Sequence, residues 1–277
     1  MRLGRREQAR PRTWPVMMTA AVIMGAVHPR LLLVALQLLT RLPVGDPWHD
    51  EADTARSVGW FAVVGALVGG VAASTWWITA LALPRLAAAA VALVVILLLT
   101  GGLHEDGLAD TADGFFGAAD PTTRLAIMRD SSLGTFGVLA LITTILLRVT
   151  LLASLPPVLG AGALVSVSAI SRGVLGAAAL GAAPAAADGR GAALLNHLAP
   201  GPALTGLLTA AVVAAMTLRL VAVPVLAAGL LAAVGIRVVA TRRLGGLTGD
   251  VLGSMIVCAE VLGLLVIAVV TGELATS

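Results

Sequence analysis

The chain has 277 residues, of which 58% are hydrophobic and only 12% are charged. Ordinary soluble domains carry roughly 25% charged residues, so this composition excludes a soluble globular protein and predicts an all-α, polytopic membrane protein. The net charge of +3 comes from arginines dispersed along the chain, which argues against a nucleic-acid partner. The single cysteine excludes an intrachain disulfide and a cysteine-rich metal site.

The chain begins with an arginine-rich stretch over residues 1–27, which we interpret as a basic amino-terminal extension. The apolar stretches 16–27 and 31–40 are each too short to span a bilayer, which takes about 20 residues, so we expect an interfacial or re-entrant segment here. About seven transmembrane helices should follow, at 57–83, 86–103, 133–155, 158–180, 203–218, 220–240 and 251–271. Because no internal repeat or soluble module is visible, residues 1–277 should form a single integral-membrane domain.

The connections between these helices differ in length and in charge. The longer ones, 41–56, 104–132, 181–202 and 241–250, all fall on one side of the membrane and carry most of the arginines outside the helices. The positive-inside rule therefore places this side, with the amino-terminal tail, in the cytoplasm.

The connection 104–132 opens with the acidic stretch HEDGLADTADG (104–114) directly after an apolar run. If this stretch is helical, Asp106, Asp110 and Asp113 lie at i, i+4 and i+7 on one face. Crowded carboxylates repel one another, and Mg²⁺ is commonly held by one or two carboxylates together with phosphate oxygens. We expect a cytoplasmic acidic active-site loop that holds Mg²⁺ against a diphosphate. A solvated loop with capping aspartates, or a proton relay in a transporter, remains an alternative.

The segment MRDSSLGTFG (128–137) precedes the third long apolar run. Asp130 and Ser131 occupy positions typical of helix N-caps, and the free N–H groups of a helix start bind phosphate readily. Arg129 would add charge-assisted hydrogen bonds. The alternative is a well-capped helix with an interfacial arginine.

The glycine-rich segment GGLTGDVLG (245–253) precedes the last helix, where Thr248 and Asp250 can act as caps. The predicted topology brings this segment to the same side as the aspartates. Asp250 would complete the metal site, act as a base or only cap the helix.

The ionisable residues Arg148, Arg172 and Glu260 lie inside apolar runs, where charges are costly and usually face a partner or a polar interior. The arginines would bind substrate phosphates or pair with Glu260. His104 adjoins the aspartates and could be a base, a phosphate donor or a metal ligand.

Taken together, these segments resemble the cobalamin synthase family, the adenosylcobinamide-GDP ribazoletransferases. The matching pieces, in the family's order, are LLTRLPV (38–44), GGLHEDGLADTADGFFG (101–117), IMRDSSLGTFG (127–137), Ser171-Arg172 and GGLTGDVLG (245–253). The resemblance implies an Mg²⁺-dependent enzyme of the bacterial cytoplasmic membrane. It would join adenosylcobinamide-GDP to α-ribazole, or to its 5′-phosphate, with release of GMP. Direct displacement is the expected mechanism, and the sequence leaves a homo-oligomer open.

By position, the resemblance implies three groups of site residues. The catalytic residues would be His104, Asp106, Asp110 and Asp250. The substrate-binding residues would be Arg129, Asp130, Ser131, Arg172 and Thr248. The metal ligands would be Glu105, Asp106, Asp110 and Asp113. Relatives often have an arginine at the position of Ser132, so one phosphate contact is in question.

Two other functions compete with this interpretation. A CDP-alcohol phosphotransferase shares the opening Asp106-Gly107, but the arginine expected next is Asp110 here. A cation or proton-coupled transporter would place its carboxylates near mid-membrane in a repeated architecture. The acids of this chain are instead concentrated in one connection.

Overall fold

The computed structural model describes residues 29–45 and 50–272, and all regular structure in these ranges is helical. One isolated bridge, between Pro184 and Leu247, is the exception. The expected all-α class is confirmed. The basic extension and the apolar stretch 16–27 lie outside the described residues, whereas the stretch 31–40 forms a short helix.

The helices follow one another with few long connections. Their bounds are α2 (Pro29–Leu39), α3 (Glu51–Arg56), η1 (Ser57–Trp60), α4 (Phe61–Thr79), α5 (Arg85–Thr100), α6 (Leu103–Gly117), α7 (Pro121–Arg129), α8 (Thr135–Ser154), α9 (Pro157–Ala179), α10 (Arg190–His197), α11 (Pro200–Leu218), η2 (Arg219–Val221), α12 (Ala222–Leu244) and α13 (Gly249–Val270). The connection 104–132 is therefore largely helical, formed by α6 and α7, and is not an open loop.

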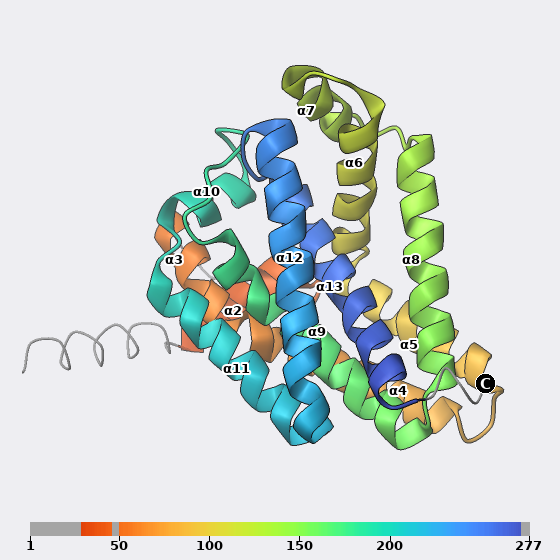
Figure 1. Cartoon of the computed structure of the whole chain (residues 1–277). Coiled ribbons are helices and arrows are strands. Elements are labelled where there is room, and N and C mark those ends of the chain that lie inside the picture. Colours follow the sequence, from red (N-terminus) through yellow and green to blue (C-terminus); the bar gives the residue numbers. More distant parts are fainter. Residues whose placement is uncertain (1–28, 46–49, 273–277) are drawn as a thin grey trace, which may run out of the picture.

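Several helices are long and apolar enough to cross a membrane. Within the described ranges, five stretches qualify by length and composition, or six if the bent pair α5–α6 is one span. One of the five, Pro200–Leu244, contains both α11 and α12, which fold back on each other at η2 (Figure 1). The chain is thus a polytopic membrane protein, while the predicted number of seven spans is not confirmed.

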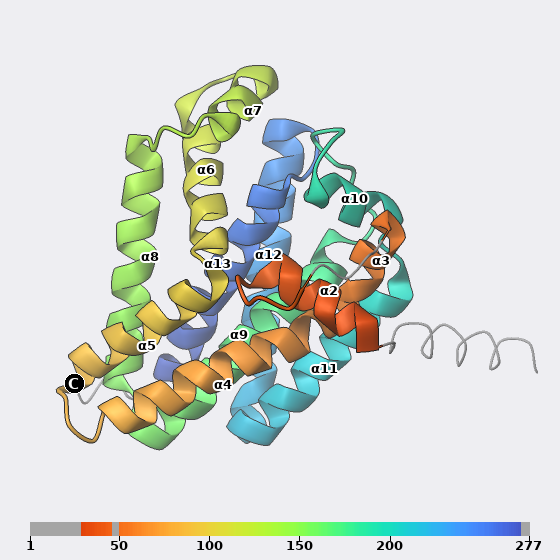
Figure 2. The same ribbon diagram turned by 180° about the vertical axis from the view of Figure 1, so that it is seen from behind.

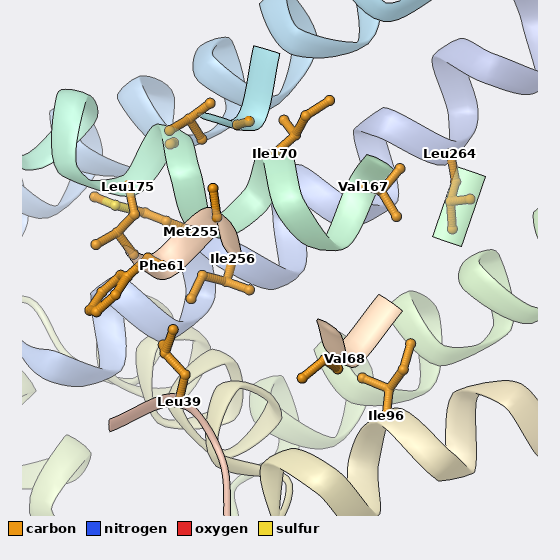
Figure 3. Packing of buried hydrophobic residues seen from close by; sticks show 14 of the residues in the cluster. Leu39, Phe61, Val68, Ile96, Val167, Ile170, Leu175, Met255, Ile256 and Leu264 are labelled. Atoms are coloured by element: carbon orange, nitrogen blue, oxygen red, sulfur yellow. The ribbon is translucent and has the colours of Figure 1, made fainter. Parts of the chain in front are cut away.

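Helix α9 forms the centre of the bundle and packs against α4, α11, α12 and α13. Small residues permit this close packing: a Cβ atom added at Gly65 of α4 would overlap the Ser168 carbonyl of α9. Such contacts between backbones are typical of helices packed in membranes. Figure 3 shows apolar side chains of α9 and α13 that contribute to this core.

The bend between α5 and α6 positions the acidic helix. Gly101 and Gly102 adopt left-handed φ values of 65° and 68°, which glycine accepts without steric cost, and the two helix axes differ by 89°. As a result α6 stands beside α8 and α13, with α7 beyond its far end (Figures 1 and 2). The same end of the molecule carries α10 and the connection between α12 and α13.

Candidate active site

Helix α6 places the acidic motif on a regular scaffold. The acidic stretch is helical, so the condition for aligning the aspartates at i, i+4 and i+7 is met. Their environments nevertheless differ along the helix. Asp106 is exposed, Asp110 is half-buried and Asp113 is buried.

A close contact between α6 and α13 brings a fourth carboxylate to this face. A Cβ atom at Gly107 would lie 2.8 Å from the carbonyl oxygen of Asp250 and 2.9 Å from its Cα, so only glycine fits here. The negative charges of Asp106 and Asp250 both act on the Asp110 carboxylate. We call Asp106, Asp110 and Asp250 the acidic cluster.

Within the part of the chain that the structure describes, the acidic cluster has no ion-pair partner. None of the ion pairs formed within residues 29–45 and 50–272 includes one of its three carboxylates. In the same ranges no three His, Cys, Asp or Glu side chains are arranged so that they could hold a metal by themselves. By themselves these carboxylates are not arranged as an all-protein cage, but they offer the oxygen ligands that Mg²⁺ combines with phosphate oxygens and retained waters.

Asp113 has a different environment from the acidic cluster. Its carboxylate accepts hydrogen bonds from the backbone N–H groups of Gly134 (2.8 Å) and Gly137 (2.9 Å), at the start of α8. A carboxylate in this position satisfies free N–H groups and interacts favourably with the helix dipole. Asp113 thus joins α6 to α8, and we leave it out of the metal set proposed below.

The expected capping role of Asp130 and Ser131 is wrong. Helix α8 has Gly134 as its N-cap residue, and its first N–H groups are taken by Asp113. Asp130 instead ends α7 and accepts a hydrogen bond from the backbone N–H of Ser132 at 2.9 Å. That bond stabilises the carboxylate and lowers the pKa of Asp130. Asp113 therefore already occupies two of the N–H groups that a phosphate at this helix start would use.

Glu105 belongs to a buried ion-pair network. Arg148 of α8 donates to Glu105 at 2.8 Å and to Glu260 of α13 at 3.0 Å, and Arg172 of α9 donates to Glu260 at 2.7 Å. Each of the four residues is at most 7% exposed. Of the two interpretations of the intramembrane arginines, the structure supports pairing with Glu260. Neither Glu105 nor Arg172 is directed to the acidic cluster by these contacts.

Two cavities meet at Asp250 of the acidic cluster. The larger, about 350 Å³, lies between α7, α10 and the start of α13, and we call it the polar cavity. Its charged and hydroxyl-bearing lining residues are Arg129, Asp188, Arg190, Thr248 and Asp250. The smaller, about 190 Å³, has mainly leucine, isoleucine and phenylalanine walls, and we call it the apolar cavity. The residues common to both are Arg190, Gly191, Gly249 and Asp250.

The remaining predicted site residues lie at three different cavities. Arg129 and Thr248 line the polar cavity, where Thr248 also caps α13 by accepting from Val251 N–H at 3.2 Å. His104 and Asp106 line the apolar cavity, and the buried Nε2 atom of His104 has no hydrogen-bond partner among residues 29–45 and 50–272. Asp130 lines a separate cavity of about 280 Å³ beside Asp113.

Arg190, at the start of α10, is a site residue that the sequence reasoning missed. In the sequence it is one of the arginines of the connections, and its charge there indicates only topology. The bridge between Pro184 and Leu247 ties that connection to the α12–α13 connection. Hence Arg190 lies at the junction of the two cavities.

Known proteins that resemble this chain all point to one family. Residues 31–268 match the cobalamin-5-phosphate synthase (CobS) family. The adenosylcobinamide-GDP ribazoletransferase of Shewanella baltica (strain OS185) is 36% identical over 247 residues, which cover 87% of this chain and 94% of that protein. The enzyme of the same name from Azorhizobium caulinodans is 38% identical over 250 residues, covering 82% and 92%. No solved structure matches the chain. The chain therefore belongs to the cobalamin-5-phosphate synthase family.

Proposed function

We propose that this chain is a membrane-bound adenosylcobinamide-GDP ribazoletransferase. One observation carries the proposal. The family match over residues 31–268 encloses an acidic cluster that forms no ion pair within the described residues, and its Asp250 lies at the junction of an arginine-lined cavity and an apolar one. The two substrates would be adenosylcobinamide-GDP and α-ribazole or its 5′-phosphate.

In the proposed reaction, a ribose hydroxyl of α-ribazole attacks the phosphorus that is attached to the cobinamide. A new oxygen–phosphorus bond forms, the bond from that phosphorus to the bridging oxygen of the diphosphate breaks, and GMP leaves with the bridging oxygen. The hydroxyl proton passes to a base, for which Asp250 and His104 are the candidates. The described residues offer no reason to invoke a covalent phospho-enzyme, so direct displacement is the simplest mechanism.

The site residues would act mainly by positioning and by charge stabilisation. Asp106 and Asp110, with Asp250 opposite, would hold Mg²⁺. When bound, that ion would neutralise the diphosphate and make GMP a better leaving group. Arg129 and Arg190 would donate charge-assisted hydrogen bonds to phosphate oxygens. The amino end of α13, which opens into the polar cavity, would add backbone N–H groups.

We further propose that the polar cavity faces the cytoplasm and that the protein lies in the bacterial cytoplasmic membrane. The arginine-bearing connections 104–132, 181–202 and 241–250 support this orientation, since positive residues are retained on the cytoplasmic side. Residues 1–277 would act as one integral-membrane domain in contact with the lipid bilayer. Whether copies of the chain associate stays a prediction to be tested.

A direct assay tests the function. The protein purified in detergent, given adenosylcobinamide-GDP, α-ribazole and Mg²⁺, should release GMP and form adenosylcobalamin. Asp106→Asn and Asp110→Asn should each lower the rate at least about 100-fold without changing the unfolding midpoint. Asp120→Asn is a matched control, because that carboxylate caps α7 at the surface and lines none of the three cavities.

Three outcomes would contradict the proposal. A wild-type protein that forms no product would refute the transferase function. A normal rate in Asp106→Asn or Asp110→Asn would refute their role as metal residues. Ion uptake into liposomes in the absence of transferase activity would favour a transporter.

A further inference from the structure

We infer that the apolar cavity binds the planar, apolar base of the nucleoside substrate and directs the ribose hydroxyl to the acidic cluster. This inference rests on the proposed transferase function and deepens it, because it assigns one substrate to one of the two cavities. The polar cavity is then left for the nucleotide diphosphate of the other substrate.

The walls of the apolar cavity suit an uncharged aromatic ring. Leu39 of α2, Phe61 of α4, Leu175 of α9 and Ile256 of α13 all line it. Figure 3 shows these four side chains gathered from four different helices around one part of the core. Transfer of an apolar ring into such surroundings is favourable, whereas burial of a phosphate there would carry a large desolvation cost.

The size of the apolar cavity separates the two substrates. An apolar cavity of about 150 Å³ in another protein holds a benzene molecule, so a cavity of about 190 Å³ fits a small bicyclic base. A corrin macrocycle with its amide side chains is several times larger than such a base and does not fit. The base of the attacking nucleoside is therefore the better occupant.

The position of the cavity also suits the reaction. Asp250 and Arg190 border both cavities, and Asp106 lines the apolar one. A base held in the apolar cavity and a diphosphate held in the polar cavity would meet at these residues. This arrangement brings the hydroxyl and the phosphorus together, which is the main requirement for a direct displacement.

His104 provides an independent indication that a ligand binds here. It lines the apolar cavity, is only 4% exposed, and its Nε2 atom has no hydrogen-bond partner within the described residues. A buried polar atom without a partner costs free energy, and a nitrogen or hydroxyl group of the bound nucleoside would supply that partner.

Substitutions of Ile256 that fill or enlarge the cavity test the inference. The probes are α-ribazole, whose base carries two methyl groups, and the same nucleoside with an unsubstituted benzimidazole. Filling the cavity with Ile256→Phe should lower kcat/KM for α-ribazole about tenfold or more relative to the smaller nucleoside, because one methylene in an apolar pocket changes kcat/KM by about 10–200-fold. Enlarging it with Ile256→Ala should weaken the binding of both nucleosides. KM for adenosylcobinamide-GDP should stay within about twofold of wild type in both variants.

Equilibrium dialysis of each nucleoside alone gives a readout independent of turnover, and it should show the same order of affinities. Leu265→Phe is the matched control, since Leu265 lies on the same helix, is 38% exposed and lines none of the cavities. If wild-type protein forms no product, the proposed function fails. If wild type is active but neither Ile256 variant changes nucleoside binding or size preference, the inference fails and the cavity holds another group, such as a lipid acyl chain. A raised KM for adenosylcobinamide-GDP alone would also overturn it.

Discussion

Replacing Glu260 by glutamine should destabilise this protein strongly. The network of Glu105, Arg148, Glu260 and Arg172 contains two carboxylates and two guanidinium groups, so its formal charge is zero. The substitution leaves one positive charge uncompensated among residues that are at most 7% exposed. Breaking a buried pair by removal of one partner typically costs about 3–5 kcal/mol, and we expect a loss in this range.

The measurement is the free energy of unfolding in detergent, followed by circular dichroism as a denaturing detergent is added. Adding Arg172→Met to Glu260→Gln removes the excess charge and should restore a large part of the loss. The two substitutions should therefore be strongly non-additive, as expected for groups in direct contact. Asp188→Asn is the control, because its pair with Arg129 is exposed and exposed pairs contribute about 0–1 kcal/mol.

Two results would refute this reasoning. The first is a Glu260→Gln protein that unfolds within about 0.5 kcal/mol of wild type, a change typical of neutral surface substitutions. The second is a double variant whose loss equals the sum of the single losses. The double variant also tests the competing interpretation: if Arg172 binds substrate phosphate, KM for adenosylcobinamide-GDP rises, whereas a purely internal arginine leaves it unchanged.

Two further substitutions separate the structural residues from the catalytic ones. Asp113→Asn removes the charged acceptor of two backbone N–H groups, so the free energy of unfolding should fall by about 1.5–3 kcal/mol. The Mg²⁺ concentration for half-maximal activity should stay the same. A clear rise in that concentration would place Asp113 among the metal ligands. In Gly107→Ala the new Cβ would lie 2.8 Å from the Asp250 carbonyl oxygen, so α6 and α13 must move apart. The rate of transfer should fall about 100-fold, because a small displacement of reacting groups lowers a rate by about this factor. The helix content of this variant should stay that of wild type, and a wild-type rate would show that α6 and α13 need not touch.

The class of fold and the location of the chemistry follow from local properties of the chain. Long apolar runs cross a membrane as helices, because a helix pairs the backbone N–H and C=O groups within the segment. The i, i+4, i+7 spacing of Asp106, Asp110 and Asp113 needed only a regular helix to align them, and α6 supplies it. The intramembrane charges of Arg148 and Glu260 required partners, and the structure shows that they pair with each other.

Only the tertiary structure decides which acidic residues form structural contacts and which remain in the acidic cluster. Asp113 and Asp110 are the same residue type in the same motif, yet α8 packs so that its free N–H groups meet Asp113, whereas Asp110 lies near Asp250. Glu105 adjoins Asp106 in sequence but points to Arg148, because successive residues of a helix face different directions. Arg190 reaches the site only through the contact between two distant connections. The spacing of residues along one helix can be read from the sequence. The partner that neutralises each charge cannot, because it lies on another helix, up to 112 positions away in the chain.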